Sequence, residues 1–352
     1  MEAPSNNSNP TIKNSSSLKS LVSLPTLALL TIVIIFIWFV STQFDLDWKN
    51  TWIKIKSIDK LLYISALIAY YSSFIFRGKR WRCLIQNANL ESRAKSTLPS
   101  TLKFSQLILI GWFVNSIAWL RMGDPYRAYA LTQETKINMT SSLGTIVAER
   151  VTDLICILIL LVVGITWLSN SHQLTEAVNL ISVAILLTIL LVISLLIIKR
   201  FGNRLSQKLP TKIRTHYEII HSVTFGSLQR MPTIMIYSLV AWLCESVRLY
   251  LVLMALDLSI TLPLILIVSL SHAILSIIPT PGGVGAVEPG VASLLLFELT
   301  QSDALSVALI DRTITYLSVL IFGSINLIMW KFILFRTDQQ KEPGLFHYNK
   351  NK

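Results

Sequence analysis

Long apolar blocks without charged residues constrain this chain more than any other feature of its sequence. No charge occurs in residues 23–40, 154–173 or 178–198. Each block comes close to the roughly 20 residues that a helix needs to cross the hydrocarbon of a bilayer. Four further blocks are mostly apolar, at residues 61–76, 232–257, 261–279 and 304–330. The sequence therefore predicts an all-α integral membrane protein.

The composition agrees with a membrane protein and argues against a nucleic-acid-binding one. Hydrophobic residues make up 53% of the 352 positions and charged residues 14%, against roughly 25% charged residues in soluble domains. The net charge is +12, but most Lys and Arg lie between the apolar blocks, which is typical of cytoplasmic loops. Cys83, Cys156 and Cys244 are too scattered to predict disulfides or a metal site, and we expect no cofactor.

The distribution of Lys and Arg predicts which loops face the cytoplasm. Seven of them, Arg77 and Arg80 included, lie in residues 77–103, and seven more lie in residues 199–230. Residues 169–177 and 257–261 carry none. The positive-inside rule places the first two stretches inside and the last two outside. We expect a plasma-membrane (inner-membrane) protein that crosses the bilayer several times, with both termini in the cytoplasm.

Two apolar blocks are predicted to be hairpins rather than full crossings. If residues 104–120 crossed the membrane, the seven cations of residues 199–230 would lie outside, so we expect a re-entrant hairpin that turns near Gly123. Residues 279–285 hold two prolines and three glycines, which interrupt a helix and predict a second hairpin. The prediction is about six full transmembrane helices plus two re-entrant helical hairpins.

Matched spacings indicate an inverted internal repeat. Gly123 precedes Arg150 by 27 residues, and Gly285 precedes Arg312 by the same number. Each arginine follows an acid, in Glu149-Arg150 and in Asp311-Arg312. Three predicted spans separate the hairpins, so the two copies would have opposite orientations, as in many transporters.

Ionisable residues inside the apolar blocks are candidates for a site, since each costs roughly 2.5–3.5 kcal/mol on insertion scales. Glu149 and Asp153 share a helix face, and with Arg150 they could line a polar cavity or form a salt-bridged helix end. The same two interpretations apply to Asp311 and Arg312. Glu245 and Arg248, three residues apart in the middle of a span, either pair with each other or face a cavity. His272 is expected to be a packed, hydrogen-bonded histidine.

The hairpin tips are candidates for an anion site. Asp124 is a favourable N-cap and Pro125 suits the first helical position. Gly282, Gly283 and Gly285 permit a tight turn that exposes backbone N–H groups, and a helix that begins there favours an anion such as phosphate. Alternatively, these glycines only allow close helix packing. The nearby Arg121 and Arg127 favour the phosphate interpretation.

These motifs together resemble the transmembrane, flippase-like domain family of lysylphosphatidylglycerol synthases. The resemblance covers roughly residues 25–335. It rests on residues 77–81, residues 111–128 with the sequence GDPYRA at their end, Glu149-Arg150 with Asp153, residues 279–288, and Asp311-Arg312. It departs from the family at residues 118–121, where members often have a proline and a small residue before the Gly-Asp pair.

The resemblance implies a membrane domain that handles lipids. In the two-part enzymes of the family, such a domain moves aminoacylated phospholipid between leaflets, and a separate cytosolic domain makes that lipid from aminoacyl-tRNA. We expect this chain to be the membrane domain standing alone, without the aminoacyltransferase domain. The predicted organisation is a disordered cytoplasmic N-terminus at residues 1–18, the transmembrane domain at residues 19–335, and a short cytoplasmic tail at residues 336–352.

The sequence thus predicts a translocator of a phospholipid or lipid-linked glycan rather than an enzyme, with no catalytic or metal-binding residues. Two alternatives are a non-transporting membrane partner of a lipid-modifying enzyme or glycosyltransferase, and an intramembrane transferase that uses Glu149 and Asp153. Expected partners are membrane lipids, a lipid-modifying enzyme or glycosyltransferase, and further copies of the chain, but no nucleic acid. The candidate substrate-binding residues are Arg121, Asp124, Arg127, Glu149, Arg150, Asp153, Glu245, Arg248, Gly282, Gly283, Gly285, Glu288, Asp311 and Arg312.

Overall fold

The structure, a computed structural model, describes residues 48–93, 98–172 and 210–341, with short pieces between 193 and 207. These residues form helices and contain no strand, so the predicted all-α membrane fold is confirmed. Among these described residues, four helical stretches are long and apolar enough to cross a membrane: Lys60–Asn87, Met139–Leu168, Met231–Ala255 and Gln301–Leu334. The predicted span at 23–40, the predicted disordered segment at 1–18 and residues 342–352 of the predicted tail lie outside the described residues. Of the predicted span at 178–198, only residues 193–194 and 196–198 are described, and they are helical.

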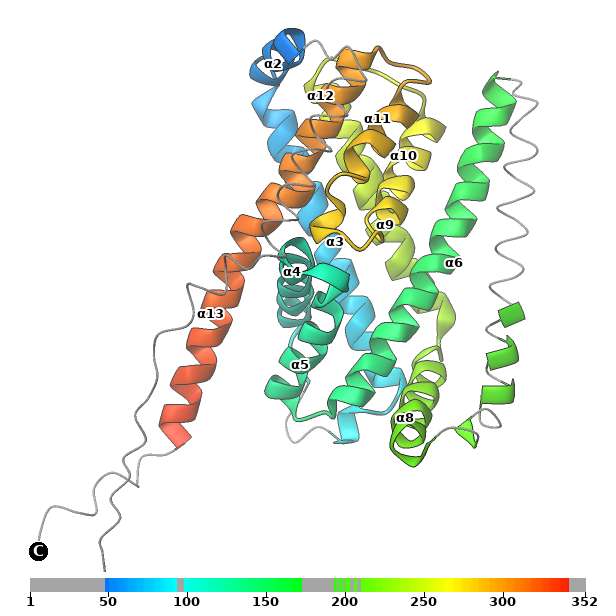
Figure 1. The fold of residues 1–352 in the computed structure, drawn as a ribbon, viewed down its shortest axis with the longest axis vertical. Coiled ribbons are helices and arrows are strands. Elements are labelled where there is room, and N and C mark those ends of the chain that lie inside the picture. Colours follow the sequence, from blue (N-terminus) through cyan, green and yellow to red (C-terminus); the bar gives the residue numbers. More distant parts are fainter. Residues whose placement is uncertain are drawn as a thin grey trace, which may run out of the picture. The chain divides into compact units, whose positions relative to one another are not determined.

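Two antiparallel helices, α3 (Lys60–Asn87) and α9 (Met231–Ala255), pack along each other through the centre of the described helices (Figure 1). The Asp59 N–H before α3 donates to the carbonyl of Ala255 at the end of α9, at 2.9 Å. At the opposite end, the side-chain amide of Asn87 donates to the carbonyls of Ser227 and Gln229, just before α9. These end contacts fix the antiparallel direction of the pair.

A hairpin and a long helix follow each of these two central helices in the chain. The first set is α4 (Thr101–Ile117), the 3-10 turn η2 (Trp119–Arg121), α5 (Gly123–Thr135) and α6 (Met139–His172). The second set is α10 (Leu262–Leu275), the 3-10 turn η3 (Pro281–Gly283), α11 (Val287–Leu295), α12 (Gln301–Arg312), the π-helical turn η4 (Thr313–Leu317) and α13 (Ser318–Lys341). The remaining described elements are α2 (Trp48–Lys56), η1 (Glu91–Arg93) and α8 (Thr211–Ser227). Both predicted hairpins are therefore present as a helix, a break and a second helix.

The packing of the two sets follows one scheme, as expected of an inverted repeat. Within each set the second arm of the hairpin packs on the following helix, α5 on α6 and α11 on α12. Between the sets the first arm packs on the long helix of the other half, α4 on α13 and α10 on α6. Because α3 and α9 run antiparallel, the two halves have opposite orientations, which is the arrangement of inverted-repeat transporters.

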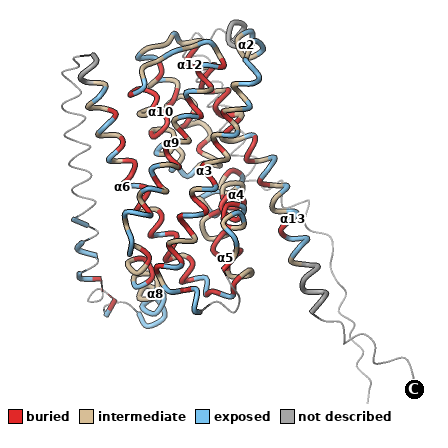
Figure 2. Tube along the Cα trace, turned by 180° about the vertical axis from the view of Figure 1, so that it is seen from behind, coloured by how far each residue is buried: buried red, intermediate tan, exposed pale blue. Residues whose placement is uncertain are grey.

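Many large apolar side chains are exposed and several arginines are buried, which is unlike a soluble protein. Leu61 and Leu120 are each 74% exposed, and Ile328 is 68% exposed, whereas Arg80 is fully buried and Arg127 and Arg248 are 1% exposed. Figure 2 shows buried and exposed positions mixed along most helices, including the described part of α13. Because exposed apolar patches of this extent are costly in water, these surfaces fit a lipid environment.

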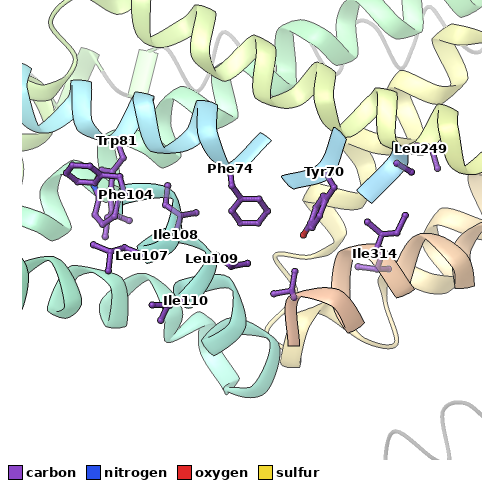
Figure 3. Close-up of a cluster of buried hydrophobic side chains, with 14 of the residues drawn as sticks. Tyr70, Phe74, Trp81, Phe104, Leu107, Ile108, Leu109, Ile110, Leu249 and Ile314 are labelled. Atoms are coloured by element: carbon purple, nitrogen blue, oxygen red, sulfur yellow. The ribbon is translucent and has the colours of Figure 1, made fainter. Parts of the chain in front are cut away.

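Aromatic and aliphatic side chains fill the interface between α3 and α4. Trp81 of α3 packs edge-on against Phe104 of α4, and Phe74 of α3 packs edge-on against Trp112 of α4, with ring centroids 5.2 and 5.0 Å apart. Figure 3 shows Trp81, Phe104 and Phe74 in this cluster. Leu249 of α9 and Ile314 of η4 belong to the same buried cluster. This packing ties the central pair of helices to the first hairpin and thereby positions its tip.

The count of cytoplasmic loop cations needs one correction. The predicted span ended at Phe76, but α3 continues to Asn87, so Arg77 and Arg80 lie inside the helix. Both are buried and form ion pairs with acids on other helices. The helix continues because no proline interrupts it and because those pairs offset the cost of burying the two charges.

We predict that a methyl group at Gly123 destabilises the first hairpin. A Cβ at this position would collide with the carbonyl of Gly111 and the side chain of Asn115, so Gly123→Ala should cost about 1–3 kcal/mol. Gly226→Ala on α8 is the matched control, since its Cβ would meet only the Cα of Ala88 at 3.8 Å. Thermal unfolding of the purified protein in detergent measures both variants. Equal melting temperatures for the two would contradict the close approach of α4 and α5.

Candidate functional site

A cavity of about 380 Å³ lies where the two hairpin tips meet the central helices α3 and α9. Seven of the predicted site residues line it: Arg121, Asp124, Arg150, Asp153, Glu245, Gly282 and Arg312. Five more hold ion pairs with other members of the charged cluster: Arg127, Glu149, Arg248, Glu288 and Asp311. The structure therefore brings together residues that lie up to about 190 positions apart in the sequence.

The first half contributes three arginines, each bound through two nitrogens to one carboxylate. Arg80 on α3 donates to both oxygens of Asp153, at 2.5 and 3.1 Å. Arg127 on α5 binds Glu149 at 2.9 and 3.2 Å, and Arg150 on α6 binds Asp124 on α5 at 2.9 and 3.2 Å. Such bidentate pairs fix both distance and orientation. They hold α3, α5 and α6 together at one side of the cavity.

The second half also contains arginines that join its helices. Arg248 on α9 donates to Glu245 at 3.2 Å and pairs with Asp311 on α12. Arg312 pairs with Glu288 on α11 at 2.7 Å and donates to the carbonyl of Gly282 at the hairpin tip, at 3.0 Å. Asp311 is therefore turned away from the cavity toward α9, whereas its neighbour Arg312 lines the cavity.

One ion pair joins the two halves across the centre. Arg77 on α3 donates to Glu245 on α9 at 3.0 Å, and both side chains are buried. The guanidinium of Arg77 lies 5.0 Å from the ring of Trp112 and 4.8 Å from that of Trp242. Contact with two aromatic faces stabilises a desolvated guanidinium beyond the ion pair itself.

The charged residues repeat between the halves as the helices do. Glu245 follows Arg77 by 168 residues, and Arg248 follows Arg80 by the same interval. Asp311-Arg312 follows Glu149-Arg150 by 162 residues. The result is two equivalent ion pairs. Arg80 lies 3.5 Å from Glu149 in the first half, and Arg248 pairs with Asp311 in the second half. The spacing noticed in the sequence thus corresponds to repeated contacts between equivalent helices.

The hairpin tips differ in detail from the sequence prediction. Asp124 is not an N-cap: α5 begins at Gly123, whose N–H donates to Asn115 at 2.7 Å, and Asp124 lies in the first turn. Its pairing with Arg150 explains the difference, because a carboxylate in a two-point ion pair is not available to cap the helix. Pro125 accordingly occupies the third helical position.

The second tip uses its glycines for the turn. Gly282, Gly283 and Gly285 have φ values of 61°, 71° and 85°, which favour glycine. The N–H of Gly285 donates to Glu288 at 2.7 Å, so a side-chain carboxylate already satisfies this backbone donor. A Cβ at Gly282 would also collide with the ring of Tyr316. Turn geometry and close packing therefore both account for these glycines.

Sequence reasoning missed several residues that line the cavity. Arg77 was assigned to a loop, and Tyr70, Trp112, Asn115, Trp242 and Tyr316 were not singled out. A helical spacing of 70, 73, 77, 80 and 84, all buried on α3, was a signal that could have placed Arg77 and Arg80 inside. His272, expected to be packed, lines the cavity with its Nδ1 3.2 Å from Asp311.

Comparisons with known proteins point to one group of membrane proteins. A family model described as the lysylphosphatidylglycerol synthase TM region matches residues 26–323, which include both hairpins and every charged residue named above. A UPF0104 membrane protein of Methanocaldococcus jannaschii is 28% identical over 236 residues, covering 66% of this chain and 97% of that protein. A UPF0104 membrane protein of Pyrococcus horikoshii is 23% identical, with 84% of this chain and 93% of that protein covered.

We predict that the buried charges stabilise the fold only as a balanced set. Arg248→Met leaves Glu245 and Asp311 with one cation fewer, and breaking a buried pair in this way costs about 3–5 kcal/mol. The double variant Arg248→Met with Asp311→Asn removes one charge of each sign and should recover much of that loss. Thermal unfolding in detergent is the measurement.

The matched control is Arg214→Met, because Arg214 pairs with Glu218 on the exposed face of α8, where both side chains are more than two-fifths exposed. It should leave the melting temperature nearly unchanged. A double variant less stable than Arg248→Met alone would contradict the balanced-set explanation.

Proposed function

Because this chain belongs to the lysylphosphatidylglycerol synthase TM region family, we propose that it moves a lipid between the two leaflets of its membrane. The lipid is a phospholipid or a lipid-linked glycan whose polar headgroup enters the cavity while its acyl chains stay in the bilayer. The observation that carries this proposal is a charged cavity enclosed by membrane-spanning helices at the junction of two inverted halves.

The chemistry of the cavity suits the barrier that a headgroup meets. A charged or hydrogen-bonding headgroup resists entry into hydrocarbon because it loses its water there. The cavity offers partners in place of that water, including Arg150 and Arg312. Its volume of about 380 Å³ falls within the range of roughly 300–1,000 Å³ found for small-molecule sites.

Few contacts hold the hairpin tips against the opposite half. Arg121 of the first tip donates to the carbonyl of Ser276 at 3.3 Å, and Tyr316 of η4 donates to the carbonyl of Ser116 at 3.3 Å. Within the first half, by contrast, three bidentate ion pairs hold α3, α5 and α6 together. The weak contacts at the tips support their separation during alternating access, while the Arg77–Glu245 pair keeps α3 and α9 together.

The test is leaflet exchange of fluorescent phospholipids in liposomes that contain the purified protein, read by chemical reduction of the dye in the outer leaflet. Wild-type protein should accelerate exchange above empty liposomes. Arg150→Ala and Arg312→Ala should lower the rate to that of empty liposomes, because each removes a guanidinium that lines the cavity in its own half. Arg214→Ala on the exposed face of α8 should exchange lipid at the wild-type rate.

Size-exclusion chromatography verifies that each variant is folded and inserted before its rate is compared. Wild-type exchange in folded Arg150→Ala and Arg312→Ala would contradict a role for the cavity in transport. No exchange with any headgroup in folded wild-type protein would instead favour a membrane partner of a lipid-modifying enzyme or glycosyltransferase.

A further inference from the structure

The charges around the cavity do not cancel. Of the described residues that line it, four are arginines and three are carboxylates: Arg77, Arg121, Arg150 and Arg312 against Asp124, Asp153 and Glu245. The ion-paired residues directly behind them balance, with Arg80, Arg127 and Arg248 against Glu149, Glu288 and Asp311. One positive charge therefore remains on the cavity wall.

Arg121 is the residue that carries this surplus. In the part of the chain that the structure describes, Arg77, Arg150 and Arg312 each pair with a carboxylate, but Arg121 has none within ion-pair distance. Its bond is to the main-chain carbonyl of Ser276, at the long distance of 3.3 Å. A cation on a cavity wall among membrane helices is costly without a counter-charge, so this position favours an anion.

The backbone is strained at the point that holds Arg121 in place. Leu120 and Arg121 both have positive φ, 57° and 54°, a conformation that costs each non-glycine residue roughly 1–2 kcal/mol. Strain of this kind persists where surrounding structure enforces it and is concentrated at functional sites. Here it directs Arg121 across the cavity toward the C-terminal end of α10 instead of out into lipid.

We propose that the cavity selects a headgroup whose net charge is a single negative charge, carried by a phosphodiester that lies against Arg121. One negative charge neutralises the wall, whereas a zwitterionic headgroup leaves it at one positive charge and a cationic headgroup raises it. A phosphate monoester in its doubly charged form would leave one negative charge. The planar guanidinium suits phosphate because it can bind two of its oxygens at once. This inference names the substrate class of the translocator proposed above and rests on that proposal.

Headgroup preference in binding and in exchange tests the inference. The probes share acyl chains and differ in headgroup: phosphatidylglycerol with one negative charge, zwitterionic phosphatidylcholine, and cationic lysylphosphatidylglycerol. Binding of short-chain versions in detergent is followed by tryptophan fluorescence, since Trp112 and Trp242 line the cavity. Wild-type protein should bind phosphatidylglycerol roughly tenfold to a hundredfold more tightly than the other two, because the ammonium groups of the other two are repelled by the positive cavity wall.

Two variants at Arg121 separate the effect of its positive charge from the effect of its shape. Arg121→Gln should abolish the preference for phosphatidylglycerol because it removes the surplus positive charge, while Arg121→Lys should retain most of the preference. Arg214→Gln is the control for a lost surface cation. Loss of one main-chain hydrogen bond at a hairpin tip leaves the pairs of both halves intact, so we expect Arg121→Gln to fold.

The outcomes distinguish a failure of the proposed binding site from a failure of the proposed translocation. Selective binding without leaflet exchange would support the phosphodiester site and contradict translocation. Equal affinity for the three headgroups, or a preference that survives in Arg121→Gln, would overturn the inference even if lipids exchange. A soluble dialkyl phosphate that binds as tightly as phosphatidylglycerol would show a phosphodiester site that ignores acyl chains, and would overturn its assignment to a lipid.

Discussion

The rest of this structure depends on ion pairs between arginines and carboxylates inside membrane-spanning helices. Isolated charges in hydrocarbon are expensive, so each buried arginine requires a nearby acid on a specific neighbouring helix. Arg80 with Asp153, Arg127 with Glu149 and Arg248 with Asp311 each join elements that the loops alone would not fix in register. Helix packing in a bilayer lacks the hydrophobic driving force that acts in water, which gives these polar contacts more weight in choosing one arrangement.

That requirement also explains the design of the hairpins. A break in a helix leaves backbone groups without partners, and at membrane depth such a break must be enclosed by protein or line a cavity. Here side chains satisfy them: Asn115 accepts from Gly123, Glu288 accepts from Gly285, and Arg312 donates to Gly282. The same contacts bring charged groups of both halves to one place, so the cavity arises where the breaks are stabilised.

Much of the fold could be predicted from sequence because bilayer thickness and backbone chemistry leave few choices. Uncharged blocks of about 20 residues identify spans, and the prolines and glycines of 279–285 identify a break. The ion-pair partners of the buried charges could not be predicted in the same way. Nothing in the local sequence shows that Arg77 meets Glu245 or that Asp124 turns to Arg150, since these pairs depend on which faces of distant helices pack together. A cluster of cations at a helix end also has the composition of a loop, and only the tertiary contacts show that Arg77 and Arg80 are buried.

The two halves are alike but not equal, and η4 is the clearest difference. After Arg312 the chain makes a π-helical turn, Thr313–Leu317, that places Tyr316 with its ring 4.8 Å from the Arg312 guanidinium. After Arg150 in the other half, α6 continues without such a turn. If the two halves exchanged conformations with each other, the two end states would therefore differ in energy. In the translocator proposed above, the π turn would give one of these conformations the lower energy and so make it the resting state.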